Sequence, residues 1–471
     1  MIKSDVTKQY RTHAVPIEDE KDTPSPLMAQ TMLITSNEEI ANALQNAIHS
    51  SAFPVEVIID QTIPWPRDCH VFLPTQAHLI PAPFDTNSQD NHNMFFGLLP
   101  EPMLHFYENS LSYMGRGGST KSRDGAEKIA KKYHVSYKKG KTCIEGGNCL
   151  IFKGSDGQPK ALVGYTSLIL SLISLNNQNY FEEKNKEISH FIATYQEKPS
   201  EDLFRVARNF FLLKRKQENT PTAYVNDYAK EILVAHNVPQ TVEAMIFLTK
   251  EKIAEELQIK SERIAYIYQT SFHIDMEVFA GPNDIIFMHN ERKMLNVQQQ
   301  IGTRKMPFLD RTINYATKNG PRDEQLFELN TKIIQAIGCT TVPVPGVLSA
   351  HYSAGDILSY SHISSLWEDS STPFEEEEDL EVVTERTSLP IINFMNGLFF
   401  DSSPPHFITA GFPDNDYPLA KPFVEAFCKK VRKACPSLQI SFINTLSADF
   451  LAGNYGSIHC LTTSIQEPSE D

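Results

Sequence analysis

The chain has 471 residues and carries 43 Lys and Arg against 58 Asp and Glu, which gives a formal net charge of −15 with neutral histidines. A large basic surface is therefore not expected, and binding to nucleic acid, which depends on Lys and Arg neutralising phosphates, is excluded as a first hypothesis. Apolar residues make up 41% of the chain and aromatic residues 10%, which is enough to fill the core of one large domain or a few smaller ones.

Neither a secretion signal nor a membrane-spanning helix is expected. Residues 1–30 are polar and charged and lack the apolar core of a signal peptide. The apolar run Leu168–Leu175 is far shorter than the ~20 residues that span a bilayer, so it predicts a buried helix. The seven cysteines are odd in number and widely scattered, which favours reduced thiols. We therefore expect a cytoplasmic protein, in its own cell or in a host, with no membrane partner.

The apolar pattern divides the chain into three parts. Residues 31–166 and 263–471 contain short strand-like runs separated by Gly, Pro, Asn or Asp, with a helical stretch at 124–133. Residues 167–262 have the spacing of three and four that is typical of amphipathic helices. We predict an α/β body formed by 31–166 and 263–471, a helical insertion at 167–262, and a polar N-terminal segment at 1–30. The clearest strand candidates are Val55–Ile59, Cys149–Phe152, Ile264–Tyr268 and Asp284–Met288, and the clearest helices are 201–216, 223–235 and 241–257.

The acidic run Glu375–Asp379 predicts a solvated loop. It lacks the alternating ligands and the central glycine of a calcium-binding EF-hand loop. No metal ion and no cofactor are expected.

Four short segments contain residues that could carry out chemistry. Cys460 lies in Gly456-Ser-Ile-His-Cys-Leu-Thr462, where a cysteine taken alone is more often a small buried residue than a nucleophile. In His273-Ile-Asp275 a base and a carboxylate alternate, and on a strand both would point to one face. Trp65-Pro-Arg-Asp68 and Glu145-Gly-Gly-Asn148 each combine a carboxylate with turn-forming residues, and an ordinary turn explains each about equally well.

Taken together, the four segments supply one potential nucleophile, one acid/base group and three carboxylates, without the spacing of a metal cluster. This set suits a guanidinium substrate, because opposed carboxylates can each accept a bidentate pair of hydrogen bonds from the planar cation. Its central carbon is then open to a thiolate, while a histidine protonates the departing nitrogen and later activates water.

The order of these segments resembles that in the guanidino-group-modifying enzymes, which include arginine, agmatine and protein-arginine deiminases and arginine amidinotransferases. The C-terminal part is most similar to protein-arginine deiminases, through Leu438–Asn444 followed by Gly456–Cys460. The Asn-bearing run Pro390–Gly397 also fits the superfamily. The resemblance implies a five-bladed α/β propeller of ββαβ units with a central active site.

The same resemblance implies roles for individual residues. It makes Cys460 the nucleophile and His273 the general acid/base, while Asp68 and Asp275 hold the guanidinium. It also expects four residues in the substrate-binding site, of which Trp65 would stack along the aliphatic part of the substrate: Glu145, Trp65, Arg67 and Asn148. The implied product is citrulline or a related urea, together with ammonia.

Several alternatives stay open on the sequence alone. The substrate could be a peptidyl arginine, which the C-terminal resemblance slightly favours, or a free guanidine such as arginine or agmatine. An amidinotransferase would use the same residues and an amine in place of water. The fold could also serve as a host- or partner-interaction module, although intact Cys460, His273, Asp68 and Asp275 argue against a degenerate site. A Cys-His-Asp protease would leave Asp68 and Glu145 without a role.

Overall fold

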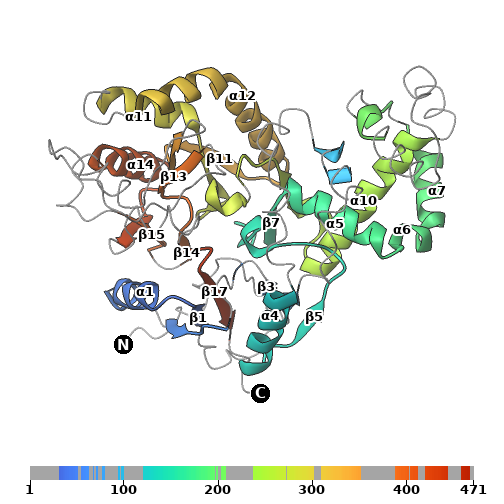
Figure 1. Cartoon of the computed structure of the whole chain (residues 1–471), viewed down its shortest axis with the longest axis horizontal. Helices are drawn as coiled ribbons and strands as arrows, with labels where there is room; N and C mark the ends of the chain where they lie inside the picture. Colours follow the sequence, from blue (N-terminus) through green and yellow to red (C-terminus); the bar gives the residue numbers. More distant parts are fainter. Residues whose placement is uncertain are drawn as a thin grey trace, which may run out of the picture.

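The computed structural model describes residues 31–50, 55–62, 67, 70–72, 77–79, 94–95, 97–99, 120–196, 198–199, 203–207, 237–271, 273–301, 309–351, 388–401, 404–411, 420–443 and 458–466. Several sequence predictions lie outside these residues: the N-terminal segment 1–30, Trp65, Asp68, the helix at 223–235 and the acidic run Glu375–Asp379. The described residues form a mixed α/β structure with small sheets and flanking helices (Figure 1).

One topology recurs in five three-stranded sheets of the described residues. In each, a first strand pairs antiparallel with a middle strand, and a helical crossover leads from the middle strand to a parallel third strand. Such crossovers are the usual way to join parallel neighbours. Each sheet and its crossover form one unit, and the five units are numbered in chain order. The first unit contains β17 (Thr462–Gln466), β1 (Thr31–Thr35), α1 (Glu38–Ser50) and β2 (Val55–Ile59); the second contains β3 (His70–Phe72), β4 (Ala77–Leu79), α4 (Thr120–Lys132) and β5 (Tyr137–Lys139); the third contains β6 (Cys149–Lys153), β7 (Pro159–Gly164) and β8 (Ile264–Ile267). The fourth unit contains β9 (Val278–Ala280), β10 (Ile285–His289), α11 (Glu291–Ile301), α12 (Leu309–Ala336) and β11 (Thr340–Val344), and the fifth contains β14 (Leu398–Phe400), β15 (His406–Ala410), α14 (Lys421–Ala434) and β16 (Gln439–Ile443).

The remaining elements connect or extend these five units. The antiparallel pair of β12 (Val347–His351) and β13 (Ser388–Asn393) lies between the fourth unit and the fifth in the chain. The crossover of the third unit holds α5 (Tyr165–Asn177), α6 (Tyr180–Glu183), α7 (Asn185–Thr194) and α10 (Val238–Leu257). These four helices gather on one side of the molecule, away from α11 and α14 (Figure 1). The 3-10 turns η5 (Gly146–Asn148), η7 (Ser261–Arg263) and η8 (Ile274–Met276) lie at strand ends.

Consecutive units contact one another, and the last contacts the first. Strand β17 touches β3, β6 touches β9, and α14 packs on β11. Val71 of β3 shares an apolar cluster with residues of β6. Helix α1 contacts β16, and an apolar cluster joins the first and fifth units through residues such as Leu33, Leu398 and Ile443. The C-terminal strand β17 thus completes a sheet begun by the N-terminal strand β1.

Local apolar patterns explain why these segments take their forms. The run predicted as a buried helix lies in α5, where every residue from Thr166 to Leu175 is buried, because apolar clusters cover it on both sides. Helix α14 buries Phe423, Phe427 and Val431, four residues apart, and ends in basic residues. The predicted strand Val55–Ile59 is β2, and the other three strand predictions match β6, β8 and β10 within one residue at either end.

The predicted helices agree where they can be compared. The stretch 124–133 falls in α4 and 241–257 in α10, whereas only 203–207 of the predicted 201–216 are described, as helix. Among the described residues, no helix is long and apolar enough to cross a membrane.

Candidate active site

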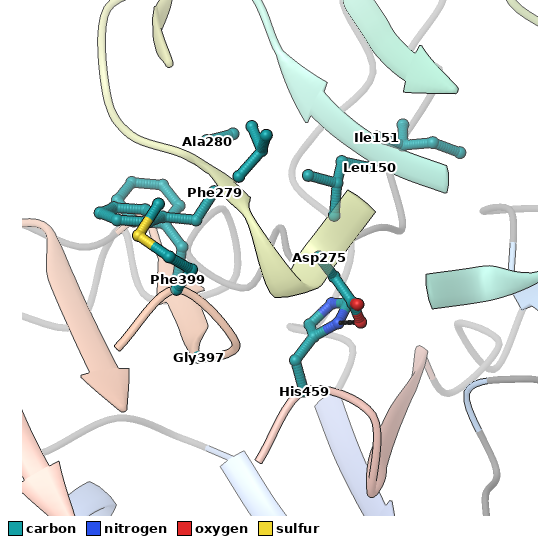
Figure 2. Close-up of a pocket in the computed structure, with 10 residues that line it drawn as sticks. Leu150, Ile151, Asp275, Phe279, Ala280, Gly397, Phe399 and His459 are labelled. Carbon is teal, nitrogen blue, oxygen red and sulfur yellow. Dashed lines mark hydrogen bonds and ion pairs between the residues drawn. The ribbon is translucent and has the colours of Figure 1, made fainter. Parts of the chain in front are cut away.

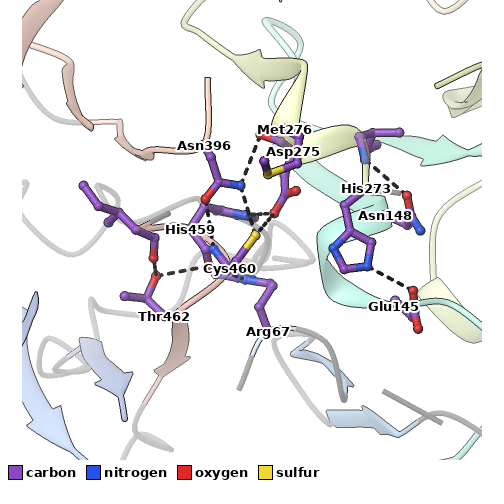
Figure 3. A network of polar contacts seen from close by, with 12 residues as sticks. Arg67, Glu145, Asn148, His273, Asp275, Met276, Asn396, His459, Cys460 and Thr462 are labelled. Atoms are coloured by element: carbon purple, nitrogen blue, oxygen red, sulfur yellow. Dashed lines mark hydrogen bonds and ion pairs between the residues drawn. The ribbon is translucent and has the colours of Figure 1, made fainter. Parts of the chain in front are cut away.

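Cys460 lies in the turn at 458–461 that leads into β17, and its side chain is buried at 1% exposure. Two other segments contact it there, the turn that follows β13 and the 3-10 turn η8, and the segment that carries η5 reaches η8 through the Glu145–His273 pair (Figure 3). They come from different units of the fold, so the site forms only when the units assemble.

The sulfur of Cys460 contacts a carboxylate and an amide. Its Sγ donates to Oδ2 of Asp275 at 3.4 Å, and Nδ2 of Asn396 donates to Sγ at 3.1 Å. The side-chain oxygen Oδ1 of the same Asn396 accepts the backbone N–H of Cys460 at 3.2 Å. Asn396 therefore fixes both the backbone and the sulfur of the cysteine. Asn393 holds Asn396 in turn, by accepting its backbone N–H at 3.1 Å.

Asp275 is the buried negative group of this cluster, at 2% exposure. Its Oδ2 accepts a hydrogen bond from Nδ1 of His459 at 2.6 Å, while its Oδ1 is buried without a hydrogen-bond partner among the described residues. Burial raises the pKa of Asp275 to about 6, although the charge of His273 and the hydrogen bond from Cys460 act in the opposite direction. An oxygen with free lone pairs in a buried site is suited to accept an N–H group from a ligand.

A second polar pair lies beside this cluster. Nε2 of His273 is 3.0 Å from Oε2 of Glu145, and both side chains are buried. A Cβ added to Gly147 would lie 2.4 Å from Nδ1 of His273, so only glycine lets the ring lie this close to η5. Because a carboxylate accepts hydrogen bonds, this pair fixes the orientation of the imidazole.

Asn148 connects the two 3-10 turns of the site. Its Oδ1 accepts the backbone N–H of Ile274 at 3.2 Å and Nε2 of Gln269 at 2.9 Å. Gln269 is itself bonded to Oγ1 of Thr166 at 2.9 Å. The structure thus uses the oxygen of Asn148, which the sequence assigned to substrate binding, to hold the turn that carries Asp275.

Arg67 brings a buried positive charge to the site. Its Nε donates to the backbone oxygen of His459 at 3.5 Å, and its charge acts to lower the pKa of Asp275. Figure 3 shows its side chain reaching the turn at 458–461 from below. Trp65 and Asp68, the neighbours of Arg67 in the same motif, lie outside the described residues.

The structure corrects one prediction about the backbone. His273 and Asp275 do not alternate on a strand, because Ile274–Met276 forms the 3-10 turn η8. The buried Ile274 packs in an apolar cluster with Leu150 and Val278, which turns the chain at this point. The side chains of His273 and Asp275 nevertheless converge with Cys460, and one potential ligand atom from each lies within 4.8 Å of the others. Imidazole, carboxylate and thiolate are also groups that bind zinc, so this trio is where a metal could be held.

A narrow cavity borders the site on its apolar side (Figure 2). Asp275 and His459 form its polar wall, and strands β6, β9 and β14 supply apolar side chains that include Leu150, Phe279 and Phe399. Neither Cys460 nor His273 lines this cavity. Its apolar walls suit packing rather than the binding of a cation.

Sequence reasoning did not assign a role to His459 or Asn396. His459 precedes Cys460 in the chain, and Asn396 lies in the predicted Asn-bearing run Pro390–Gly397. The polar character of both residues within apolar segments was the available signal. Only the contacts with Asp275 and Cys460 reveal what they touch.

Comparison with known proteins gives a limited result. No protein-family model matches the chain, and no curated protein matches it. The chain is similar to two solved structures of agmatine deiminase from C. jejuni. One is a cysteine-to-serine variant with substrate bound, at 11% identity and a TM-score of 0.39, covering 98% of this chain and 95% of the other. The second has 12% identity and a TM-score of 0.38, covering 98% and 94%. Similarity at this level does not assign an activity, and the closeness to protein-arginine deiminases stays a prediction.

Proposed function

We propose that this chain is a cysteine-dependent deiminase, which hydrolyses a guanidinium to a urea and ammonia through a covalent intermediate on Cys460. The observation that carries the proposal is the buried cluster in which the Cys460 sulfur touches Asp275 and Asn396. The His273–Glu145 pair adjoins the cluster, because His273, Asp275 and Cys460 lie together. A nucleophile, an oriented imidazole and buried carboxylates are what guanidinium chemistry requires.

The reaction can be written with these side chains. The thiolate of Cys460 attacks the central carbon of the guanidinium, and a C–S bond forms. The protonated imidazole of His273 gives its proton to a nitrogen, the C–N bond breaks, and ammonia leaves a thiouronium on the enzyme. Water then attacks the same carbon while His273 takes its proton. The C–S bond breaks, releasing the urea product and regenerating the thiol.

The carboxylates would hold the cationic substrate. Asp275 offers its buried Oδ1, which has no partner among the described residues. In the proposal, Asp68 and Glu145 supply further acceptors, Trp65 stacks along the aliphatic part of the substrate, and Arg67 and Asn148 complete the substrate-binding site. A carboxylate facing a guanidinium in a buried site makes a strong, charge-assisted hydrogen bond.

The proposal includes the shape of the body. Five units of one topology, each touching the next, with the fifth touching the first, favour a five-bladed α/β propeller with the site at its centre. The helical crossover of the third unit would be the insertion at 167–262 within the body formed by 31–166 and 263–471.

Mass spectrometry of incubated guanidines tests the activity. Free arginine, agmatine and an arginine-containing peptide are each incubated with enzyme in water enriched in heavy oxygen. Hydrolysis predicts one heavy oxygen in a urea product and release of ammonia from at least one substrate. The Cys460→Ala variant should give no product. The Cys428→Ala variant, which changes a buried cysteine on α14, should behave like the wild type.

Other outcomes separate the alternatives. Product that forms only when an amine is added, without heavy oxygen, would indicate an amidinotransferase. No product from any of the three guanidines, with or without an amine, would contradict the deiminase proposal and favour a binding module on the same fold.

A further inference from the structure

The backbone segment before Glu145 is held by side chains from the helical crossover. Lys141, Thr142 and Cys143 lie between β5 and η5, in an irregular stretch. Their N–H groups and one carbonyl bind side chains of α10 and α5. Buried backbone groups need partners, and in this segment the two helices supply them.

Glu256 of α10 accepts two of these N–H groups. Its Oε1 accepts the N–H of Lys141 at 2.9 Å, and its Oε2 accepts the N–H of Thr142 at 3.0 Å. Oε2 also accepts the hydroxyl of Thr142 at 2.5 Å and lies 3.7 Å from Nδ1 of the buried His78. A carboxylate can serve all these donors because it is an acceptor at both oxygens. Glu256 is 3% exposed, an unusual position for a glutamate in a helix.

Helix α5 and the residue that caps its C-terminus also bind this segment. The hydroxyl of Ser171 accepts the N–H of Cys143 at 2.9 Å. Ser174 and Gln178 both donate to the carbonyl oxygen of Lys141, at 2.9 and 3.0 Å. Ser171 and Ser174 lie on a largely apolar helix, and their hydroxyls bind the backbone of the segment 141–143.

We propose that Glu256 is a positioning residue for the active site, through which α10 sets the geometry of the Glu145–His273 pair. Glu145 follows Cys143 by two residues, and the intervening Ile144 is fully buried, so little slack separates the held segment from the pair. The catalytic meaning of this inference rests on the proposed deiminase function. If Glu256 acts in this way, the helical crossover of the third unit contributes to the geometry of the site.

The test compares Glu256→Gln with Glu255→Gln. Glu255 is the preceding residue of α10, is exposed, and accepts a hydrogen bond from Lys252 rather than from the loop. An amide keeps the shape of Glu256 but loses one acceptor, so the loop should shift. The first readout is the imidazole N–H proton signal of His273 in protein labelled with nitrogen-15 histidine. A buried N–H donated to Glu145 should give a slowly exchanging signal in the wild type and in Glu255→Gln. The signal should be lost in Glu145→Gln and in Glu256→Gln.

The second readout is turnover of the guanidine that the wild type hydrolyses. We expect kcat to fall about tenfold or more in Glu256→Gln, with KM changing less, since small displacements of a catalytic group cost this much. If Glu256→Gln does not fold, Thr142→Val removes the hydroxyl bond alone and should weaken the same signal.

Three results would overturn the inference. They are an unchanged His273 signal in a folded Glu256→Gln protein, an equal loss in Glu255→Gln, or no such signal in the wild type. A wild type that keeps the signal but hydrolyses no guanidine would contradict the proposed function alone, because the comparison of signals would still show whether Glu256 positions the pair.

Discussion

Replacing Asp275 by Asn should make the protein more stable relative to the wild type as the pH rises, while abolishing turnover. Asp275 is fully buried, and its pKa is raised from 3.8 to about 6, chiefly by burial. The folded protein therefore binds this proton more tightly than the unfolded chain does. The stability that comes from the bound proton is fully present below pH 3.8 and is lost as the pH rises through 6. Asn has no titratable proton, so the free energy of unfolding of the variant does not fall in this way as the pH rises.

The size of the effect follows from the shift. About two pKa units correspond to about 3 kcal/mol over the whole pH window, at 1.36 kcal/mol per unit. Between pH 5 and pH 7.5 the linkage relation gives about 1.4 kcal/mol of that change. Asn also places a buried N–H₂ group where Oδ1 now lies, which costs about 1–3 kcal/mol at every pH. The prediction therefore concerns how the difference in unfolding free energy between the variant and the wild type changes with pH, and not the value of that difference at one pH.

Urea unfolding at pH 5 and pH 7.5 measures the difference directly. Asp284→Asn is the matched control, because burial acts to raise the pKa of Asp284 but hydrogen bonds from Ser155 and Lys160 outweigh it and lower the pKa. Its carboxylate stabilises the fold above pH 3.8, so Asp284→Asn should be less stable than the wild type by the same amount at both pH values. A constant difference for Asp275→Asn would refute the claim that Asp275 is a buried charge with a raised pKa.

Three further changes test the site. Cys460→Ala should lower turnover about 10³-fold or more in a folded protein, and iodoacetamide should label Cys460 faster than the other cysteines; unimpaired turnover would disprove the covalent route. Asn396→Asp places a negative charge 3.1 Å from the sulfur and should slow both alkylation and turnover about tenfold or more; unchanged alkylation rates would speak against the contact. Gly147→Ala pushes a Cβ against His273 and should lower kcat about 10²-fold. Gly320→Ala on α12, where nothing lies within 4 Å, should keep full activity, and equal losses in both would mean that Gly147 acts only through stability.

The elements with a strong local pattern could be predicted from the sequence. Val55–Ile59 and Leu168–Leu175 are examples, since period-two and continuous apolar runs limit what a segment can bury. The short motifs also pointed to Cys460, His273 and Asp275, and the structure brings these three side chains together. Their roles, and those of the motif residues outside the described part of the chain, stay predictions.

The 3-10 turn at Ile274–Met276 could not be predicted, because alternating polar and apolar residues fit a strand equally well. Packing of Ile274 among residues of other strands, together with the bond from its N–H to Asn148, decides the turn. Tertiary context overrides local preference where such a contact is available.

The sequence by itself determined the local elements and the kinds of reactive groups that the chain carries. Only the tertiary structure decided which groups touch. His459 meets Asp275 across 184 positions, and Glu256 meets Thr142 across 114. No local pattern encodes such pairs, because their distance depends on how whole units pack and on which strand completes which sheet. The position of a buried charge is settled by contacts that join residues far apart in the chain.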